Sequence, residues 1–129
     1  MKSFFRLSAL LAVVLAGAVF AQKPGITRTV INRKDISMPG REAVIAKVEL
    51  APGTAAGRHT HPGEEISYIL EGEGEILVEG QPVQKVKAGD SFIIPAGAIH
   101  DARNTGTVPM RLVGIYLVDK SKPMATPAP

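Results

Sequence analysis

Hydrophobic residues beyond position 22 recur in short runs at alternating positions, and no long segment repeats them at helical spacing. Alternation is the period of a β-strand with one buried face. The pattern predicts strands over residues 26–33, 43–50, 66–70, 75–79, 83–86, 92–94, 99–104 and 110–118. Turn-forming pieces rich in Gly, Pro, Asn and Asp separate these runs. Short strands at this spacing predict an all-β fold, either an antiparallel sandwich or a barrel.

The start of the chain has a different pattern, that of an export signal. Lys2 and Arg6 precede an apolar run over residues 7–19, and small residues follow at Ala18 and Ala21. The run is about fifteen residues long, whereas a membrane-spanning helix needs roughly 20. This favours a cleaved signal peptide over a retained anchor. We expect cleavage after Ala18 or Ala21 and a periplasmic or secreted mature protein.

The length allows one domain. With 129 residues the chain can bury a modest core and is too short for two. Its last residues are rich in Pro, Ala and Thr, a composition typical of disordered ends. We therefore expect a signal peptide over residues 1–21, one domain over residues 22–120 and a disordered tail over residues 121–129.

Composition narrows the classes of function and the sources of stability. The chain has 15 Lys+Arg and 12 Asp+Glu, and loss of residues 1–21 removes two bases and no acids, leaving 13 − 12 = +1. A nearly neutral chain without basic clusters has no electrostatic footprint for nucleic acid. There are no cysteines, which excludes both disulfides and a lipidated Cys anchor. Stability must then come from the core, an oligomer or a metal.

The three histidines are candidate metal ligands. His59 and His61 flank Thr60 shortly before Glu65, and His100 lies far away in the sequence. Residues two apart on a strand share a face at roughly 6.6 Å. Two imidazoles can therefore converge on an ion held at about 2.0–2.2 Å from each. Glu65, shortly after a turn, can add a third ligand, and His100 a fourth if its strand lies alongside.

The segments around these residues resemble the two sequence motifs of the cupin family. The first motif is carried by Gly53, His59, His61, Glu65 and Gly72, and the second by Gly89, Pro95, Gly97, His100 and Asn104. The resemblance covers residues 53–104 and implies a double-stranded β-helix, or jelly-roll, barrel. It also implies that His59, His61, Glu65 and His100 bind one divalent transition metal ion. Cupins with similar motifs use Mn, Fe, Ni, Cu, Co or Zn, and the residue types do not select among these metals.

Two nearby polar residues compete with this ligand set. Glu64 is an alternative carboxylate, but the motif spacing favours Glu65 and leaves Glu64 as a solvated or supporting acid. Asn104 is expected to stabilise a turn with its side chain rather than to bind metal. Arg58 and Arg103 lie next to ligands and could hold an anionic substrate at the rim, although a solvated position is favoured for both.

Alternation along the predicted strands sorts the other neighbours of the ligands. With Glu65 and His100 facing inward, the inner side also receives Ser67, Ile69, Ala102 and Asn104. Tyr68 and Asp101 fall on the outer side or at an interface. The inner wall is then small and weakly polar, and we expect no titratable side chain to be aimed at the ion.

The expected site has a functional rather than a structural character. Three imidazoles and one carboxylate leave coordination positions open, and closed structural zinc sites more often use Cys. We favour a dioxygenase-type oxidoreductase acting on a small organic molecule, because metal and dioxygen need little help from side chains. The alternatives are a lyase, decarboxylase or isomerase that uses the ion as a Lewis acid, and a non-catalytic binder of a small molecule or metal. We also expect a homodimer, since a small barrel has strand edges to cover.

Overall fold

The computed structural model describes residues 23–129, and strands are the only regular elements in that range. They are β1 (Ile26–Asp35), β2 (Arg41–Leu50), β3 (His59–Thr60), β4 (Gly63–Glu71), β5 (Glu73–Val78), β6 (Gln84–Lys87), β7 (Ser91–Ile94), β8 (His100–Asn104), β9 (Met110–Asp119) and β10 (Thr126–Pro127). The all-β prediction is confirmed. The sequence did not predict β3 and β10, because two residues are too few to show a period. The predicted signal peptide lies outside the described residues.

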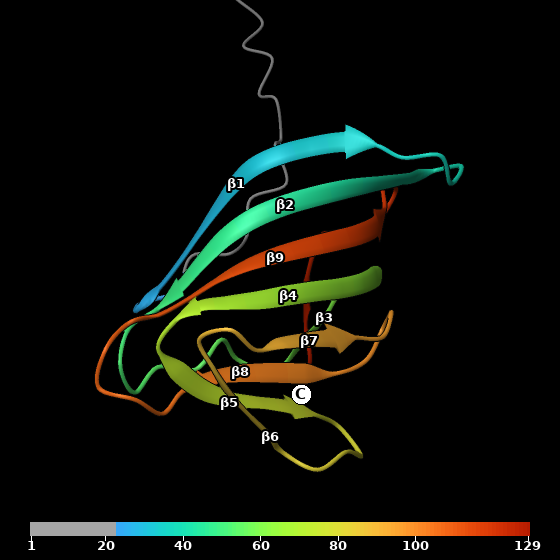
Figure 1. Cartoon of the computed structure of the whole chain (residues 1–129). Coiled ribbons are helices and arrows are strands. Elements are labelled where there is room, and N and C mark those ends of the chain that lie inside the picture. Colours follow the sequence, from blue (N-terminus) through green and yellow to red (C-terminus); the bar gives the residue numbers. More distant parts are fainter. Residues whose placement is uncertain (1–22) are drawn as a thin grey trace, which may run out of the picture.

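Two antiparallel sheets of five strands each face one another. The first sheet has the order β1-β2-β9-β4-β7 and the second β10-β3-β8-β5-β6. Figure 1 shows β1, β2, β9 and β4 running side by side, with β8, β5 and β6 below them. From β2 onward the chain passes repeatedly between the sheets, which winds paired strands into the predicted jelly-roll. Within residues 23–129 no helix is long and apolar enough to cross a membrane.

The interior contains two clusters of buried apolar side chains. The larger cluster comprises Ile26, Val48, Leu50, Ile69, Ile76, Val86, Phe92, Ile94, Met110 and Leu112. The smaller cluster comprises Val44, Ala46, Tyr116, Val118 and Met124. Burying each large apolar side chain stabilises the fold by about 1.5–3 kcal/mol. The clusters occupy opposite ends of β2 and β9, so a site between them is enclosed from both sides.

The C-terminal segment differs from the predicted disordered tail over residues 121–129. Met124 is only 6% exposed and packs in the smaller cluster, while Thr126 pairs with Thr60 of β3. At the start of the segment, Ser121 donates from its backbone and hydroxyl to the Asp119 carboxylate. Composition alone missed this order because one apolar side chain reaches the core and β3 offers a strand edge for pairing.

Candidate metal centre

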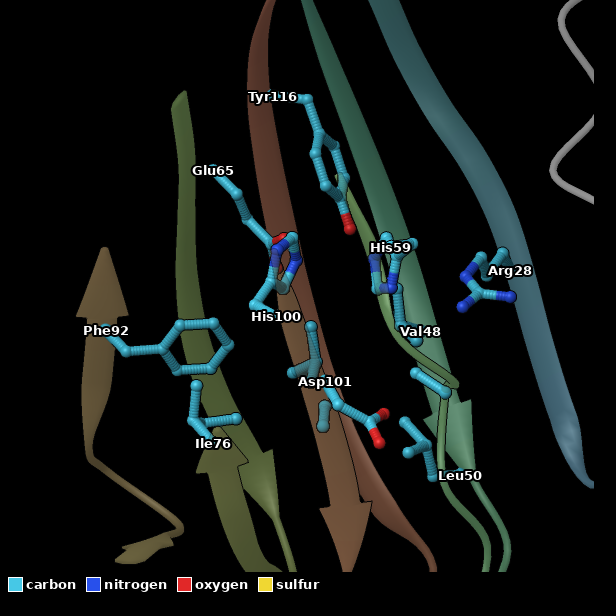
Figure 2. A pocket seen from close by; sticks show the side chains of 13 residues that line it. Arg28, Val48, Leu50, His59, Glu65, Ile76, Phe92, His100, Asp101 and Tyr116 are labelled. Atoms are coloured by element: carbon cyan, nitrogen blue, oxygen red, sulfur yellow. The ribbon is translucent and has the colours of Figure 1, made fainter. Parts of the chain in front are cut away.

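Both sheets contribute to the cluster of candidate ligands. In the second sheet, His59 of β3 lies directly opposite His100 of β8. The strand of His100 therefore lies beside that of His59, as a shared site requires. His61 follows β3, and Glu65 projects from β4 of the first sheet. One nitrogen or oxygen from each of the four residues lies within 4.8 Å of all the others. Figure 2 shows His59, His100 and Glu65 directed toward one another.

Short contacts join the four side chains. The Glu65 Oε2 atom lies 3.2 Å from the Nε2 atoms of both His61 and His100. The Nε2 atoms of His59 and His61 are also 3.2 Å apart. Each imidazole therefore presents Nε2, and not Nδ1, to the common space.

The other ring nitrogens fix which tautomer each neutral histidine adopts. Each Nδ1 atom faces a backbone carbonyl, which can only accept a hydrogen bond, so Nδ1 carries the proton. The three acceptors are the carbonyls of Gly57, Met124 and Ala98, at 2.7, 2.7 and 2.9 Å from His59, His61 and His100 respectively. When all three histidines are neutral, three Nε2 lone pairs and one carboxylate would converge on an ion, a donor set that suits a divalent transition metal.

Electrostatics in the cluster keep Glu65 ionised. Burial alone would raise the pKa of Glu65, but hydrogen bonds with His100 and His61 outweigh it and hold that pKa well below its usual value. Burial would lower the pKa of His100, yet its hydrogen bond with Glu65 prevails and raises it. At His59 burial is the main cause that lowers the pKa to about 4. Glu65 is therefore an anion at pH 7, and His59 is neutral.

Local packing places the Glu65 carboxylate. The Ser67 hydroxyl donates to Oε1 of Glu65 at 2.7 Å, which leaves Oε2 for the histidines. Gly63 lets the start of β4 approach β9, since a Cβ there would lie 1.8 Å from the Leu117 carbonyl oxygen. Glu65 then lies opposite Tyr116 of β9. The expected inward direction of Ser67 is confirmed.

A small cavity adjoins the cluster on the inner side of both sheets. Its walls are largely apolar and include Val48, Leu50, Ile76, Phe92 and Leu112 of the larger cluster. The space is about 30 Å³, roughly enough for two water molecules. Arg28, Tyr116 and Asp101 add polar groups to the lining besides the candidate ligands (Figure 2). With the side chains as they stand, the cavity admits a ligand of only a few heavy atoms.

Arg28 is a cavity residue that the sequence interpretation missed. It lies on β1 two residues from buried Ile26, so both side chains take the same face. Figure 2 shows it reaching from β1 toward the cavity. Burial lowers the pKa of Arg28, while Tyr116 and Glu65 oppose that shift. Because arginine remains protonated in proteins, it brings a positive charge to this wall. Alternation along residues 26–33 would have predicted that Arg28 faces inward with Ile26.

Tyr116 overturns the expectation that no titratable side chain is aimed at the site. It is 3% exposed, and its ring centroid lies 4.8 Å from that of His61. Burial is the main cause that raises the pKa of Tyr116 well above its usual value, and Glu65 adds to it. Gly114 makes room for the ring, since a Cβ there would lie 2.6 Å from the tyrosine oxygen. Alternation along residues 110–118 would have predicted its inward direction.

Two other assignments near the ligands agree with the structure. Glu64 is exposed, on the opposite face of β4 from buried Glu65. Asn104 is 2% exposed and stabilises a turn: its amide donates to the carbonyls of Leu50 and Val108 and accepts from the Gly106 N–H. Buried Ile69 and half-exposed Tyr68 also take the predicted sides of β4.

Asp101 differs from its predicted outward or interface position. It is 5% exposed, and its carboxylate accepts the Gly57 N–H at 2.8 Å and contacts Arg103 at 3.5 Å. The segment that leads into β3 pairs with the edge of β8 through the Ala55–Arg103 bridge, and its Gly57 N–H reaches the Asp101 carboxylate. Parity along a strand sorts side chains between two faces, but it does not show which distant backbone groups will bond to a polar side chain.

Arg58 and Arg103 do not line the cavity beside the cluster. They line a second cavity, of about 210 Å³, together with residues of β5 and the loop that follows it. Arg58 forms an ion pair with Glu79, and Arg103 with Asp101. Both arginine side chains are about half exposed, at 48% and 50%, as expected for solvated positions. His100 and Asp101 border both cavities.

Comparisons with known proteins agree with this fold. A family model described as a cupin domain matches residues 46–116. The oxalate-binding protein of Thermotoga maritima is 35% identical over 83 residues, which cover 64% of this chain and 68% of that protein. Germin-like protein subfamily 2 member 1 of Arabidopsis thaliana is 29% identical over 121 residues, covering 81% of this chain and 55% of that protein. The match thus spans about half the length of the germin-like relative.

A solved structure with a similar fold has about the same sequence identity to this chain as the two relatives above. It is the DMSP lyase DddQ from Ruegeria pomeroyi, which superposes with a TM-score of 0.61 at 29% identity. The superposition covers 67% of this chain and 43% of that one.

Proposed function

This chain belongs to the cupin family, and on that premise we propose an exported enzyme that uses one divalent transition metal ion to oxidise a small organic carboxylate with dioxygen. The proposed ligands are His59, His61, Glu65 and His100. One observation carries the proposal: their donor atoms lie within 4.8 Å of one another, and each Nδ1 proton is directed to a carbonyl away from the cluster. Mn, Fe, Co, Ni, Cu and Zn are all candidates for this donor set.

The protein environment would tune such an ion in two ways. When bound, an ion with four protein ligands keeps coordination positions open for a small oxygen ligand and for dioxygen. Ser67 fixes one oxygen of Glu65, so the carboxylate stays oriented toward the histidines. The largely apolar walls of the cavity would strengthen charge interactions beside the ion, because they lower the local dielectric.

Arg28 supports a carboxylate as the substrate group. Its positive charge lies on the wall of a cavity that admits only a few heavy atoms. A guanidinium binds a carboxylate with paired hydrogen bonds of fixed geometry. The Thermotoga maritima relative, at 35% identity, is named an oxalate-binding protein, which agrees with a small carboxylate here. We therefore propose oxalate and similarly small carboxylates as the first compounds to test, since a larger carboxylate would require the surrounding side chains to move further than oxalate does.

The side chains around the cavity favour oxidation over chemistry that needs a base. Burial raises the pKa of Tyr116 well above its usual value, so the phenol keeps its proton at pH 7. Arg28 is a cation, and Asp101 already accepts the Gly57 N–H. General-base catalysis requires a group that is unprotonated at the working pH and reaches the substrate proton. Neither Tyr116 nor Arg28 meets that requirement in the metal-free protein.

The experiment is oxygen uptake by protein loaded separately with each candidate metal. With a small carboxylate such as oxalate present, we expect uptake that requires both metal and carboxylate. The double variant with His59→Ala and His61→Ala should show none. Turnover of the carboxylate at the same rate under argon would contradict the oxidation.

A lyase or decarboxylase is the second candidate, and Tyr116 is the observation that favours it. A protonated phenol in the cavity can deliver a proton to the carbon atom left after bond cleavage. Product formation without dioxygen, lost in Tyr116→Phe, would support this candidate. Carboxylate binding without any turnover would instead indicate a binding module.

We propose that the mature protein is a homodimer through the outer face of the first sheet. Ile66, Tyr68, Leu70 and Ile93 are 38–66% exposed on neighbouring strands β4 and β7. Exposed apolar patches of this kind are typical of interaction sites in soluble proteins. Sedimentation should give a dimer at micromolar concentration, and Ile93→Lys should give a monomer. A monomeric unmodified protein would contradict the proposal.

Export remains a proposal that rests on the sequence of residues 1–21. Mass spectrometry of the protein recovered from the periplasm or medium should find a new N-terminus after Ala18 or Ala21. An intact Met1 in a cytoplasmic fraction would contradict it.

A further inference from the structure

We infer that residues 120–129, here termed the C-terminal strap, position His61 for metal binding. The inference rests on the proposed metal site and adds to it a part of the chain outside both cupin motifs. Met124 makes the contact, because its carbonyl oxygen accepts the His61 Nδ1 proton at 2.7 Å. Met124 is therefore a positioning residue that acts through its backbone.

The three histidines differ in how far along the chain their acceptors lie. His59 and His100 each donate to a carbonyl two residues away, at Gly57 and Ala98. The acceptor of His61 is 63 residues away. The turns that carry His59 and His100 can thus orient those rings locally, whereas His61 depends on a distant segment being in place.

The strap is held on both sides of Met124. On the N-terminal side, the Lys122 N–H donates to the Asp119 carbonyl, and Ser121 donates to the Asp119 carboxylate. On the C-terminal side, Thr126 pairs with Thr60, and the Ala128 N–H donates to the Arg58 carbonyl at 3.0 Å. These contacts place the Met124 carbonyl beside His61.

The Met124 side chain provides the apolar anchor between these contacts. It is 6% exposed and packs with Val44, Ala46, Tyr116 and Val118. Without the anchor and the β10 pairing, the His61 ring would lose both its acceptor and part of the cover that leaves it 3% exposed. Its proton could then move to Nε2, which would remove the lone pair that faces the cluster. Loss of such a supporting hydrogen bond typically weakens metal affinity by roughly 10–100-fold.

The test uses two substitutions in the full chain that loosen the strap by different means. Met124→Ala removes most of the apolar anchor, and Ala128→Pro removes the N–H that bonds to Arg58. We expect each to weaken zinc and manganese binding by at least about tenfold, measured by competition with a chelator. Met124→Leu keeps an apolar anchor of similar size and should bind both metals like the unmodified protein.

A matched control separates positioning from general destabilisation. Val86 is buried in the larger cluster, on β6, so Val86→Ala also removes buried apolar volume but leaves the strap intact. It should lower the thermal midpoint of the metal-free protein and leave metal affinity unchanged. Equal losses of metal affinity in Val86→Ala and Met124→Ala would overturn the inference.

The protonation of the histidine rings can also be measured in the metal-free protein. Nitrogen-15 NMR of the metal-free protein should show protons on Nδ1 of His59, His61 and His100, and Ala128→Pro should lose only the His61 signal. Retention of that signal together with unchanged metal affinity in both strap variants would contradict the inference. If the unmodified protein bound no metal, the proposed function would fail, whereas the NMR comparison would still report whether the strap orients His61.

Discussion

The larger cluster and the proposed metal site fill the same barrel with opposite kinds of side chain. In the larger cluster Ile69 and Met110 are 0% exposed, and apolar contacts account for their burial. At the site His61, Glu65 and His100 are just as enclosed, at 3–6% exposed, yet each is polar and depends on named partners. Burial of polar groups costs free energy unless hydrogen bonds or an ion compensate. The comparison indicates that the larger cluster stabilises the fold, whereas the fold stabilises the arrangement of polar side chains at the site.

The largest expected effect is the loss of metal binding when two of the proposed ligands are removed. We expect the double variant with His59→Ala and His61→Ala to lose measurable metal binding. It should also lose the metal-dependent rise in thermal midpoint, because an ion that binds only the folded state stabilises it by about 2.7 kcal/mol at 100 times Kd. Metal analysis and thermal denaturation with and without metal measure both effects.

Thr60→Ala is the matched control, since Thr60 lies between the two histidines and its pairing with Thr126 uses the backbone. It should keep the metal and the rise in thermal midpoint. Full metal content in the double variant would refute the ligand assignment.

A substitution that removes a side chain from the larger cluster should lower the stability of the fold and leave metal affinity unchanged. Ile69→Ala removes a side chain that is 0% exposed, and such substitutions cost about 2–5 kcal/mol of unfolding free energy. We expect this loss in both the metal-free and the metal-loaded protein, with metal affinity unchanged. Urea denaturation and chelator competition provide the two measurements. A large fall in metal affinity would mean that the larger cluster and the proposed metal site are energetically coupled.

Loss of the positive charge on the cavity wall should affect the carboxylate but not the metal. Hydrogen bonds to charged groups contribute about 1.5–3 kcal/mol, so Arg28→Gln should weaken carboxylate binding by roughly 10–100-fold. Calorimetric titration of metal-loaded protein with oxalate measures this effect. Arg33→Gln, on the same strand but exposed, is the control and should bind oxalate normally. Equal affinities in the two variants would remove Arg28 from the substrate site.

Sequence patterns predicted more about the ligands than about the wall around them. Alternation and motif spacing predicted the strands and the gathering of the three histidines with Glu65, because those signals are local or lie within the two cupin motifs. Arg28 and Tyr116 lie outside both motifs, on strands where the alternating apolar residues predict a core face but do not indicate that a polar side chain shares it. Asp101 and Met124 were missed for another reason: each is buried by a segment distant in sequence, which no local pattern records.

The smallest expected effect is the pH dependence of metal binding, and its sign follows from the hydrogen bond that Glu65 shares with His100. Because the pKa of His100 is raised, the incoming ion must displace a proton from it as the pH falls toward that pKa, and affinity should decrease with decreasing pH. The slope should approach one proton per ion, about tenfold in affinity per pH unit. The pKa of His59 is about 4, so His59 should steepen the curve only in acid.

Glu65→Gln is the variant that sharpens this pH prediction. It removes the charge that raises the pKa of His100 and leaves burial, which lowers it, unopposed. The point at which metal affinity begins to fall should therefore move to lower pH, even though affinity itself decreases because one charged ligand is lost. Chelator competition between pH 5 and 8 measures both quantities. An unchanged onset in Glu65→Gln would show that the coupling between Glu65 and His100 does not control proton release when the ion binds.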